Sequence, residues 1–196
     1  MSVSPRPSSE YPAPVLKDED IREPLFAFLE ETCGKCRIVE EKVIGKARAD
    51  VVMVLPDALA GLEIKSDADS YTRLAGQVKQ YTQYFDYNFV VVGTSHALHI
   101  EEHVPENWGI ITVELVDGAA DFYMLRRPQR NAKRKLKRKM NLLWRPELDS
   151  IKEKTLRYKY KDKSKAFIID KIIAAADEAV IDRLISDELF EREYRR

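Results

Sequence analysis

Hydrophobic and polar positions along this 196-residue chain follow two different periods. Alternating residues and short apolar runs, which are typical of β-strands, occur in the first two thirds of the chain. Spacings of three and four residues, which are typical of amphipathic helices, occur between these runs and dominate the last third. The expected strands are residues 37–43, 49–55, 61–66, 88–94, 109–114 and 122–127, and the expected helices are residues 19–32, 69–84, 95–103, 164–176 and 178–195.

This order of elements predicts an α/β (α+β) fold, in which a central mixed β-sheet is flanked by helices and followed by an α-helical C-terminal appendage. Pro56-Asp57 and Gly61 separate two apolar runs and indicate a hairpin. The run NFVVVGT follows a helical pattern and is typical of a strand that pairs in parallel after a crossover. The expected divisions are a disordered, Pro- and Ser-rich segment at 1–17, a core at 18–130, and a basic lead-in with a helical extension at 131–196.

Composition adds limits on the setting of the protein. Hydrophobic residues make up 44% of the chain and charged residues 34%, with a net charge of zero, so we expect a core beneath a heavily charged surface. Apolar runs are too short to cross a membrane, and the N-terminus lacks a signal-peptide pattern. With two cysteines, a disulfide framework is not expected. These features predict a cytoplasmic protein with no membrane partner.

Basic residues are concentrated in the segment RRPQRNAKRKLKRK, residues 126–139. A run of like charges is usually a solvated face. Because this one is a single-sign block in an otherwise neutral protein, contact with the phosphate backbone of nucleic acid is the favoured interpretation. The segment has no evident base-reading device, so it predicts no sequence specificity. The residues assigned to this contact are Arg126, Arg127, Arg130, Lys133, Arg134, Lys135, Lys137 and Arg138.

The hairpin ADVVMVLPDALAGLEIKS carries three charges in an apolar setting. Glu63 and Lys65 are two residues apart on a strand, so both side chains leave the same face, and a suitable register places Asp50 across from them. Two adjacent carboxylates repel and take up a proton unless a cation joins them, and Mg²⁺ is the natural cation. Lys65 could orient or deprotonate a water, or neutralise charge on a phosphate. The alternative is a buried salt bridge between Lys65 and one acid.

Asp50 followed by Glu63-Ile64-Lys65 after a hairpin resembles the PD-(D/E)XK nuclease superfamily, which has the restriction-endonuclease-like fold. The resemblance covers about 18–127, although Ala49 stands where that family often has proline. The segment GLEIKSDADSYTRLAGQVKQYTQYFDYNFVVVG and the tail motif LLWRPEL are similar to a bacterial group within that superfamily. The resemblance implies hydrolysis of DNA with Mg²⁺ (or Mn²⁺), held by Asp50, Glu63 and the backbone carbonyl of Ile64, and Lys65 as the catalytic lysine.

Many members of that superfamily add a third acid from the first helix or strand. The candidates are Glu40, Glu41, Glu23 and Glu30, and Glu40 is preferred as a metal ligand because it lies near the opening of the hairpin in sequence. Glu23 has an alternative role in a capping box with Asp20, at the start of the first helix.

Gln77 and Tyr81 resemble the Gln-x-x-x-Tyr motif of RecB-type nucleases, and their spacing places both on one helix face. The resemblance implies that Gln77 holds a metal-bound water or phosphate and that Tyr81, at the rim of the cleft, contacts nucleic acid. In the alternative, Tyr81 belongs to the core and Gln77 is a boundary residue. Arg73 falls just past the site and is assigned to nucleic acid.

The expected activity is that of a Mg²⁺-dependent endonuclease acting on DNA. The alternatives are a catalytically inactive nucleic-acid- or protein-binding module of the same fold, and an RNA nuclease. Nucleases that cut both strands commonly dimerise, so a homodimer is among the expected partners. Cys33-x-x-Cys36 has the spacing of half a metal site but lacks a second pair. The histidines at 96, 99 and 103 are expected at the surface.

Overall fold

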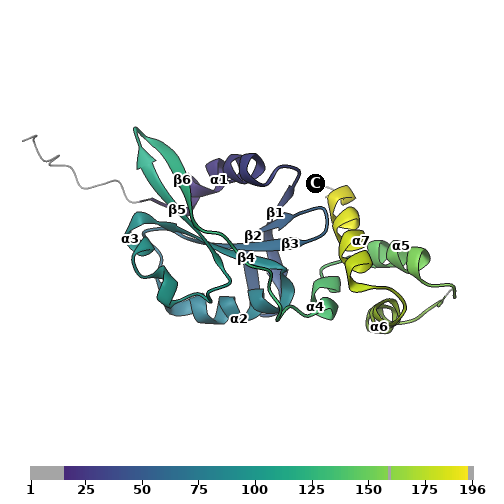
Figure 1. Cartoon of the computed structure of the whole chain (residues 1–196). Helices are drawn as coiled ribbons and strands as arrows, with labels where there is room; N and C mark the ends of the chain where they lie inside the picture. Colours follow the sequence, from purple (N-terminus) through teal and green to yellow (C-terminus); the bar gives the residue numbers. More distant parts are fainter. Residues whose placement is uncertain (1–15, 159, 194–196) are drawn as a thin grey trace, which may run out of the picture.

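The computed structural model describes residues 16–158 and 160–193, which form a mixed β-sheet flanked by helices (Figure 1). The α+β class and the helical C-terminal end that the sequence predicts are both confirmed. The strands, in their spatial order across the sheet, are β1 (Arg37–Ile44), β2 (Ala47–Val54), β3 (Leu59–Lys65), β4 (Tyr87–Gly93), β5 (Gly109–Val116) and β6 (Ala119–Arg126). The α-helices are α1 (Asp18–Cys33), α2 (Leu74–Tyr84), α3 (Thr94–Ala97), α4 (Leu136–Met140), α5 (Arg145–Thr155), α6 (Lys165–Ala175) and α7 (Glu178–Glu191).

The sheet combines an antiparallel meander with a parallel centre. β1, β2 and β3 are antiparallel neighbours, whereas β4 is parallel to β3 and β5 is parallel to β4. The crossover from β3 to β4 contains α2, so the prediction of a parallel strand at NFVVVGT is confirmed. β6 returns antiparallel to β5 through Asp117 and Gly118, whose φ angles of 51° and 82° suit a tight two-residue turn.

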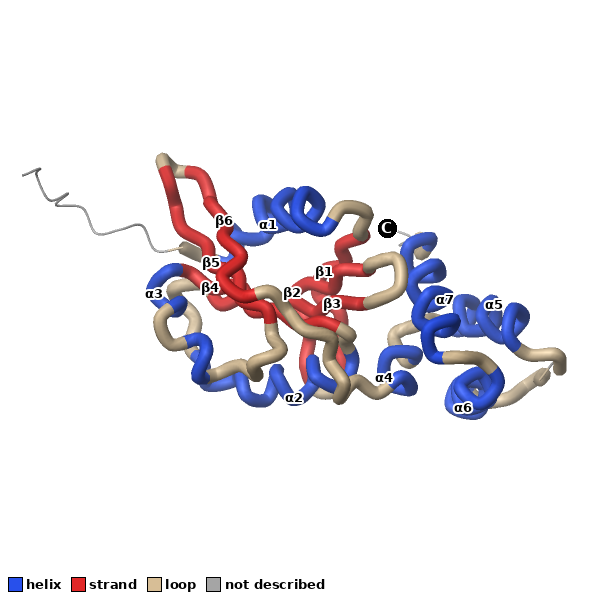
Figure 2. Tube along the Cα trace, in the orientation of Figure 1, coloured by secondary structure: helices blue, strands red, loops and turns tan. Residues whose placement is uncertain are grey.

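Each face of the sheet packs on a different set of helices, and α1 and α2 lie on opposite sides (Figure 2). Val51, Met53 and Leu62 belong to the core beneath α1. Val52 and Val54 belong to the second core, which α2 covers. That second core continues without a break into buried leucines and isoleucines of the C-terminal helices. The C-terminal helices therefore share one continuous core with the sheet and α2, and are not held to them by a linker alone.

Several predicted boundaries need correction. The helix expected over 69–84 starts as α2 at Leu74, after a 3-10 turn. The helix expected over 95–103 is divided into α3 and a separate 3-10 turn. α7 ends at Glu191, and the last two residues of the helix predicted over 178–195 lie outside the described residues.

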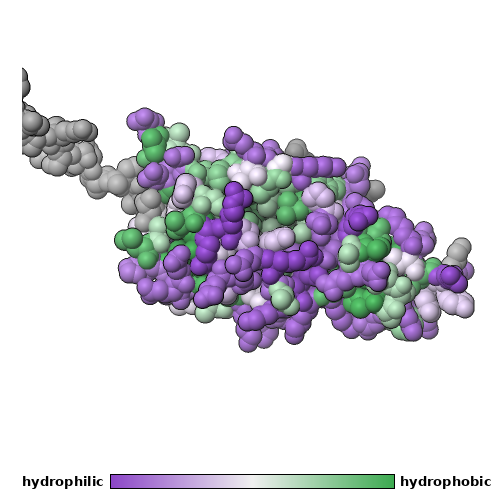
Figure 3. All heavy atoms as spheres, viewed as in Figure 1, coloured by the Kyte–Doolittle hydropathy of each residue, from purple (hydrophilic) through white to green (hydrophobic). Residues whose placement is uncertain are grey.

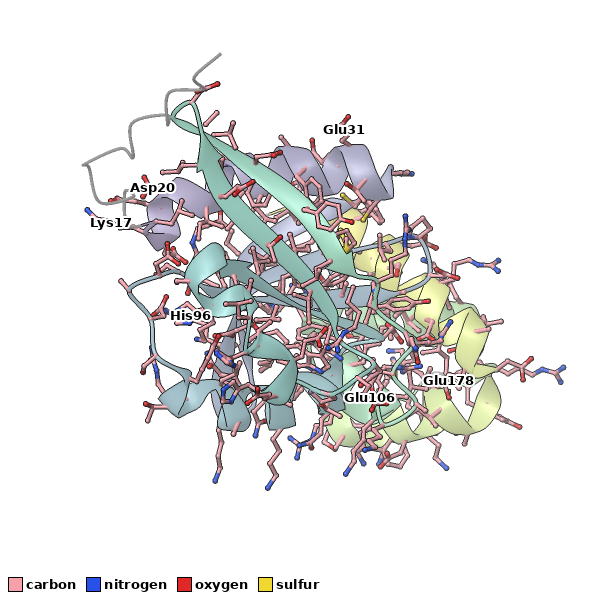
Figure 4. All side chains as sticks on the ribbon, turned by 60° about the vertical axis from the view of Figure 1, so that its left-hand side comes forward. Lys17, Asp20, Glu31, His96, Glu106 and Glu178 are labelled. Carbon is pink, nitrogen blue, oxygen red and sulfur yellow. The ribbon has the colours of Figure 1, made fainter. Side chains whose placement is uncertain are left out.

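The N-terminal end of α1 also differs from its prediction. The helix begins at Asp18, and Asp20 accepts a hydrogen bond from the backbone N–H of Lys17 at 3.0 Å instead of preceding the helix (Figure 4). Most of the segment predicted to be disordered lies outside the described residues. Leu16, however, is 3% exposed, and its backbone N–H donates to Asp67 at 3.3 Å, so the prediction is wrong at this residue.

Hydrophilic side chains cover much of the face seen in Figure 3, with hydrophobic ones at the tip of the β5–β6 hairpin, where Val116 is 46% exposed. Among the residues that the structure describes, no helix combines the length and the apolar composition needed to span a membrane.

Candidate active site

The two acids of the charged hairpin, Asp50 and Glu63, come together where β2 and β3 stop pairing. The ladder between the strands runs as far as Val51 opposite Leu62, so the two acids occupy the next step of the same register. The side chain of Asp50 turns toward β3, where its Oδ2 accepts a hydrogen bond from the backbone N–H of Ile64 at 2.8 Å. The juxtaposition of acids that the sequence predicts is therefore present.

The carboxylate of Glu63 is buried and surrounded by donors. Lys65 Nζ lies 2.7 Å from Glu63 Oε1, and the Gln77 amide donates to the same oxygen. The Tyr81 hydroxyl lies 2.9 Å from Glu63 Oε2 and accepts a hydrogen bond from the backbone N–H of Asp50 at 3.2 Å. Tyr81 thus connects both acid-bearing strands to α2.

Burial dominates the protonation of both acids. Burial first, and then the nearby Glu63 carboxylate, raises the pKa of Asp50 to about 7. Burial also raises the pKa of Glu63, although the Lys65 ammonium opposes that shift. The charges of Lys65 and Arg22 are therefore insufficient for two carboxylates in this setting, and the pair favours binding a proton or another cation.

Oxygen atoms at the site fit a hard divalent cation. Asp50 Oδ1 accepts no hydrogen bond from the described residues, and Gln77 Oε1 is buried without a partner among them. Mg²⁺ and Mn²⁺ prefer such oxygen ligands, and Mg²⁺ commonly uses one or two carboxylates and retains several waters. Within residues 16–158 and 160–193, no group of three His, Cys, Asp or Glu side chains is arranged for a metal. The protein's own contribution is thus a two-carboxylate site, centred on Asp50 and Glu63.

These acids form the floor of a cleft of about 980 Å³. The cleft is bordered by the turn between β1 and β2, the first half of α2 and the start of α1. Lys65 and Gln77 line the cleft, as predicted. The remaining lining residues are Asp18, Arg22, Glu41, Lys46, Ala47, Arg48, Ile64, Asp69, Thr72, Arg73, Gly76, Lys79 and Gln80.

The prediction that Glu40 joins the two acids is wrong. Glu40 pairs with Val51 across the β1–β2 ladder, and directly opposed residues of an antiparallel pair share a face. Val51 packs beneath α1, so Glu40 lies on that face, where its carboxylate is 3.5 Å from Arg22. Nearness in sequence is a poor guide here because a shift of one residue changes the face of the sheet.

Glu41 is the acid of β1 that lines the cleft. Its φ of 53° is uncommon for a residue other than glycine, and the regular ladder between β1 and β2 is interrupted at this position. Its carboxylate lies 3.0 Å from Arg22 and also contacts Arg48. Arg22 in turn lies 2.7 Å from Asp18 and donates to the backbone carbonyl of Asp50 at 3.3 Å.

Tyr81 is not at the rim of the cleft. Its side chain is completely buried, between the acids and the aromatic core formed with Phe85 and Trp108. The prediction that Tyr81 contacts nucleic acid is therefore wrong. Its hydroxyl instead forms hydrogen bonds with the Glu63 carboxylate and with the backbone N–H of Asp50. Arg73, by contrast, is exposed on the cleft wall, where a contact with nucleic acid is sterically open.

The basic segment at 126–139 contributes mainly to packing. Lys139 is fully buried between Asp86 and Asp182, with distances of 2.6 and 2.7 Å to their carboxylates. Arg134 lies 2.6 Å from Asp86 and 3.0 Å from Asp182, so its assignment to nucleic acid is wrong. Burial raises the pKa of Asp182, and Lys139 opposes that shift. This ionic cluster has a buried centre of Asp86, Arg134, Lys139 and Asp182, and Arg130 and Glu178 pair with it from its exposed edge, with Glu178 at the start of α7 (Figure 4).

Other cations of the segment also have partners within the chain. Arg126 donates to the carbonyl oxygens of Trp108 at 2.8 Å and Pro105 at 3.1 Å. Lys137 forms an exposed pair with Asp170 at 2.6 Å. The exposed cations of the segment that form no ion pair with the described residues are Arg127, Lys133, Lys135 and Arg138.

The cysteines and histidines lie outside the cleft lining. Cys33 and Cys36 are free and half-buried, and burial raises the pKa of both thiols. His96, on α3 (Figure 4), and His103 both lie against the ring of Tyr71, with ring centroids 4.9 and 4.2 Å away. His99 is exposed, as expected.

Sequence reasoning missed the residues that shape the rim of the cleft. Arg22 lies on a helix 28 residues before Asp50, and no short-range pattern connects them. Lys46 and Lys79 come from two elements that approach one another only in the folded chain. The glycine at position 45 is the sequence signal for a turn beside Lys46. In the structure Gly45 has a φ of 61° and lies in the turn of the β1–β2 hairpin.

Comparison with known proteins gives one family. The family described as bacteriophage P4 protein cII matches residues 15–194, and the chain belongs to it. No curated protein and no solved structure matches the chain.

Proposed function

We propose that this protein is a metal-dependent nuclease that hydrolyses phosphodiester bonds in DNA. The observation that carries the proposal is a pair of carboxylates, the buried Glu63 and the half-buried Asp50, whose pKa values are both raised and which lie beside Lys65 at the floor of an open cleft. The strand–turn–strand–helix–strand order around them also supports the resemblance to PD-(D/E)XK nucleases.

The side chains at the floor have separable roles in this proposal. Lys65 is held beside Glu63, where its ammonium can donate to a non-bridging phosphate oxygen and offset the charge that grows there during attack by water. Tyr81 and Gln77 hold the Glu63 carboxylate from the helix side. The Ile64 N–H donates a hydrogen bond to one carboxylate oxygen of Asp50, and the other oxygen remains available to a ligand.

Asp50, Glu63 and the Ile64 carbonyl would hold the Mg²⁺ or Mn²⁺ ion. Such an ion, when bound, supplies a more acidic water and charge compensation at the phosphate.

Cleavage assays on supercoiled plasmid, linear duplex, single-stranded DNA and RNA, with Mg²⁺, Mn²⁺ or EDTA, test the proposal. We expect cleavage of DNA with either metal and none with EDTA. Asp50→Asn and Lys65→Met should each lower the rate at least ~100-fold, as expected when groups that stabilise the transition state are removed. Lys137→Met, which removes an exposed ion pair far from the cleft lining, should cleave like the wild type.

Two other results are informative. Cleavage of RNA alone would assign the same chemistry to an RNA nuclease. If the wild type cleaves nothing and Mg²⁺ leaves its melting temperature unchanged, then the Lys65–Glu63 pair is a structural bridge and the protein is a binding module.

We also propose that the exposed cations of the basic segment contact the phosphate backbone. Their replacement, in the triple variant Lys133→Ser, Lys135→Ser, Arg138→Ser, should weaken binding to all DNA sequences alike. It should also reduce the slope of log K against log [salt] by up to ~0.9 for each phosphate that the variant no longer neutralises. An unchanged slope would identify these residues as a solvated surface.

A further inference from the structure

We infer that a polynucleotide strand crosses the cleft with its sugar–phosphate backbone passing over Gly76 of α2, beside the free cations that line the cleft. The inference rests on the proposed function for its ligand class, and it adds the path that the ligand takes. It depends on three observations: an otherwise unexplained glycine, the free cations beside it, and the internal pairing of the nearby acids.

Gly76 has no local reason to be glycine. Three of the seven glycines of the chain have positive φ angles, and three others have no space for a Cβ atom because side chains of Phe85, Asp67 or Phe89 fill it. Gly76 belongs to neither group, since a Cβ atom added to it would meet nothing within 4 Å. In a helix, glycine is less favourable than alanine. What glycine offers here is a close approach of another backbone.

The open space beside Gly76 is the cleft itself. Arg73 and Lys79 lie three residues before and three residues after Gly76, so they are about 9 Å apart along the helix axis. Both are exposed and line the cleft. Lys46, on the turn between β1 and β2, is also exposed and lines the cleft. Each of these three cations is free of ion pairs with residues that the structure describes.

The acids near this path are already engaged. Asp69 accepts hydrogen bonds from the backbone N–H and the hydroxyl of Ser66, at 3.0 and 2.7 Å. Asp18 and Glu41 are both paired with Arg22. The walls therefore present net positive charge to a ligand, whereas the floor presents two acids.

This distribution fits a polymer of phosphates better than a single phosphate group. The free cations come from separate elements around the cleft: Arg73 ends the 3-10 turn before α2, Lys79 lies on α2, and Lys46 lies on the β1–β2 turn, whose Gly45 is next to Gln80 of α2. A strand with repeated anions can contact each of them while one of its phosphates lies over the floor. The absence of a side chain at Gly76 then allows the sugar–phosphate backbone to lie against the helix.

The test measures binding separately from cleavage. Fluorescence anisotropy with labelled single-stranded and duplex oligodeoxynucleotides would be carried out in an Asp50→Asn background with Mg²⁺. We expect Gly76→Leu to weaken binding at least tenfold, and Gly76→Ala to weaken it less. The matched control is Ala75→Leu, which adds the same side chain to the adjacent exposed position outside the cleft lining and should change binding less than twofold.

Folding and charge are checked in the same series. Because leucine is the better helix former, Gly76→Leu should melt at or above the temperature of its parent, so weaker binding would not reflect a loss of structure. Lys46→Ser and Lys79→Ser should each reduce the salt slope by ~0.7–0.9. Normal affinity in Gly76→Leu, or unchanged salt slopes in both lysine variants, would overturn the path.

The outcomes separate this inference from the proposed function. If Gly76→Leu binds DNA more weakly than its parent and the wild type cleaves nothing, the path stands and the nuclease proposal fails. If the wild type cleaves DNA and Gly76→Leu cleaves and binds normally, the nuclease proposal stands and the path is wrong.

Discussion

The protein contains two groups of charges whose central residues are equally buried but whose charges are differently balanced. In the ionic cluster, Asp86 and Lys139 are both fully buried, and in the candidate active site Glu63 and Lys65 are 1% and 3% exposed. Burial therefore does not separate the two. Their charge balance does: the buried part of the cluster sets Asp86 and Asp182 against Arg134 and Lys139. At the site, Lys65 is the one cation that is ion-paired with Glu63, and the Arg22 charge that acts on Asp50 is itself paired with Asp18 and Glu41.

This difference indicates what each group contributes. The acids and cations of the balanced cluster are paired with one another, so its contribution is to hold the C-terminal helices on the core. An unbalanced pair of acids costs stability, and such a cost is typical of sites that bind a ligand. Neither depth nor the density of charge along the chain reveals this, because the most basic segment is also one in which folding pairs several cations with acids, among them Arg134 and Lys139.

The largest effect is expected from removing the central cation of the cluster. Lys139→Met leaves Asp86 and Asp182 without the ammonium between them, and should lower the free energy of unfolding by about 3–5 kcal/mol. Lys137, two residues before Lys139 in the sequence, forms an exposed pair with Asp170. Lys137→Met breaks this pair and should lower the free energy of unfolding by no more than about 1 kcal/mol. Urea unfolding of both variants measures the contrast, and equal losses would contradict a structural role for the cluster.

The opposite sign is expected at the candidate active site. The pKa of Asp50 is about 7 in the folded protein, above its ordinary value of 3.8, so the stability linked to this group is complete below pH 4 and is lost as the pH rises through 7. Asp50→Asn removes that loss while retaining an acceptor for the Ile64 N–H. Above pH 7 it should raise the free energy of unfolding by about 2–4 kcal/mol.

Unfolding experiments between pH 4 and pH 8 check this prediction, and the gain should disappear at pH 4. Added Mg²⁺ should stabilise the wild type at pH 8 but have little effect on Asp50→Asn. A variant that is less stable than the wild type at pH 8 would show that Asp50 supports the fold rather than a ligand site.

A smaller effect is expected where the site meets its helix. Tyr81→Phe leaves the partly buried backbone N–H of Asp50 without its acceptor and removes a donor from Glu63, and should cost about 1–2 kcal/mol. Tyr84→Phe, on the same helix, is the control because the Tyr84 hydroxyl forms no hydrogen bond with the described residues. Similar losses of stability in both variants would mean that the Tyr81 hydroxyl does not organise the site.

The sequence predicts the local parts of this structure well. The hairpin places Asp50 near Glu63 because a short turn and a regular register determine which residues face each other. The four-residue spacing likewise places Gln77 and Tyr81 on the helix face that meets the acids. Both inferences depend only on contacts that a few residues of chain can specify.

The failed predictions depend on distant contacts or on the identity of a face. Nearness in sequence favours Glu40, whereas its pairing with Val51 decides its face. The basic segment reads as free because its partner acids, Asp86 and Asp182, lie 53 and 43 residues from Lys139. A pattern of charges along the chain contains no record of pairings over such distances.

The position of Asp86 has a consequence for the order in which the protein is completed during synthesis. Asp86 joins the end of α2 to the start of β3, where its side chain accepts a hydrogen bond from the Leu59 N–H at 2.7 Å. Asp182 follows Asp86 by 96 residues (182 − 86), so it leaves the ribosome roughly 5–20 s later at ordinary rates of translation. For that interval the nascent chain has a finished β2–β3 hairpin, but Lys139 and Arg134, once made, share a single acid. A chain released before Asp182 is made would therefore contain every residue of the cleft floor. Its junction between α2 and β3 at Asp86 would, however, lack the ion pairs that Asp182 forms with Lys139 and Arg134.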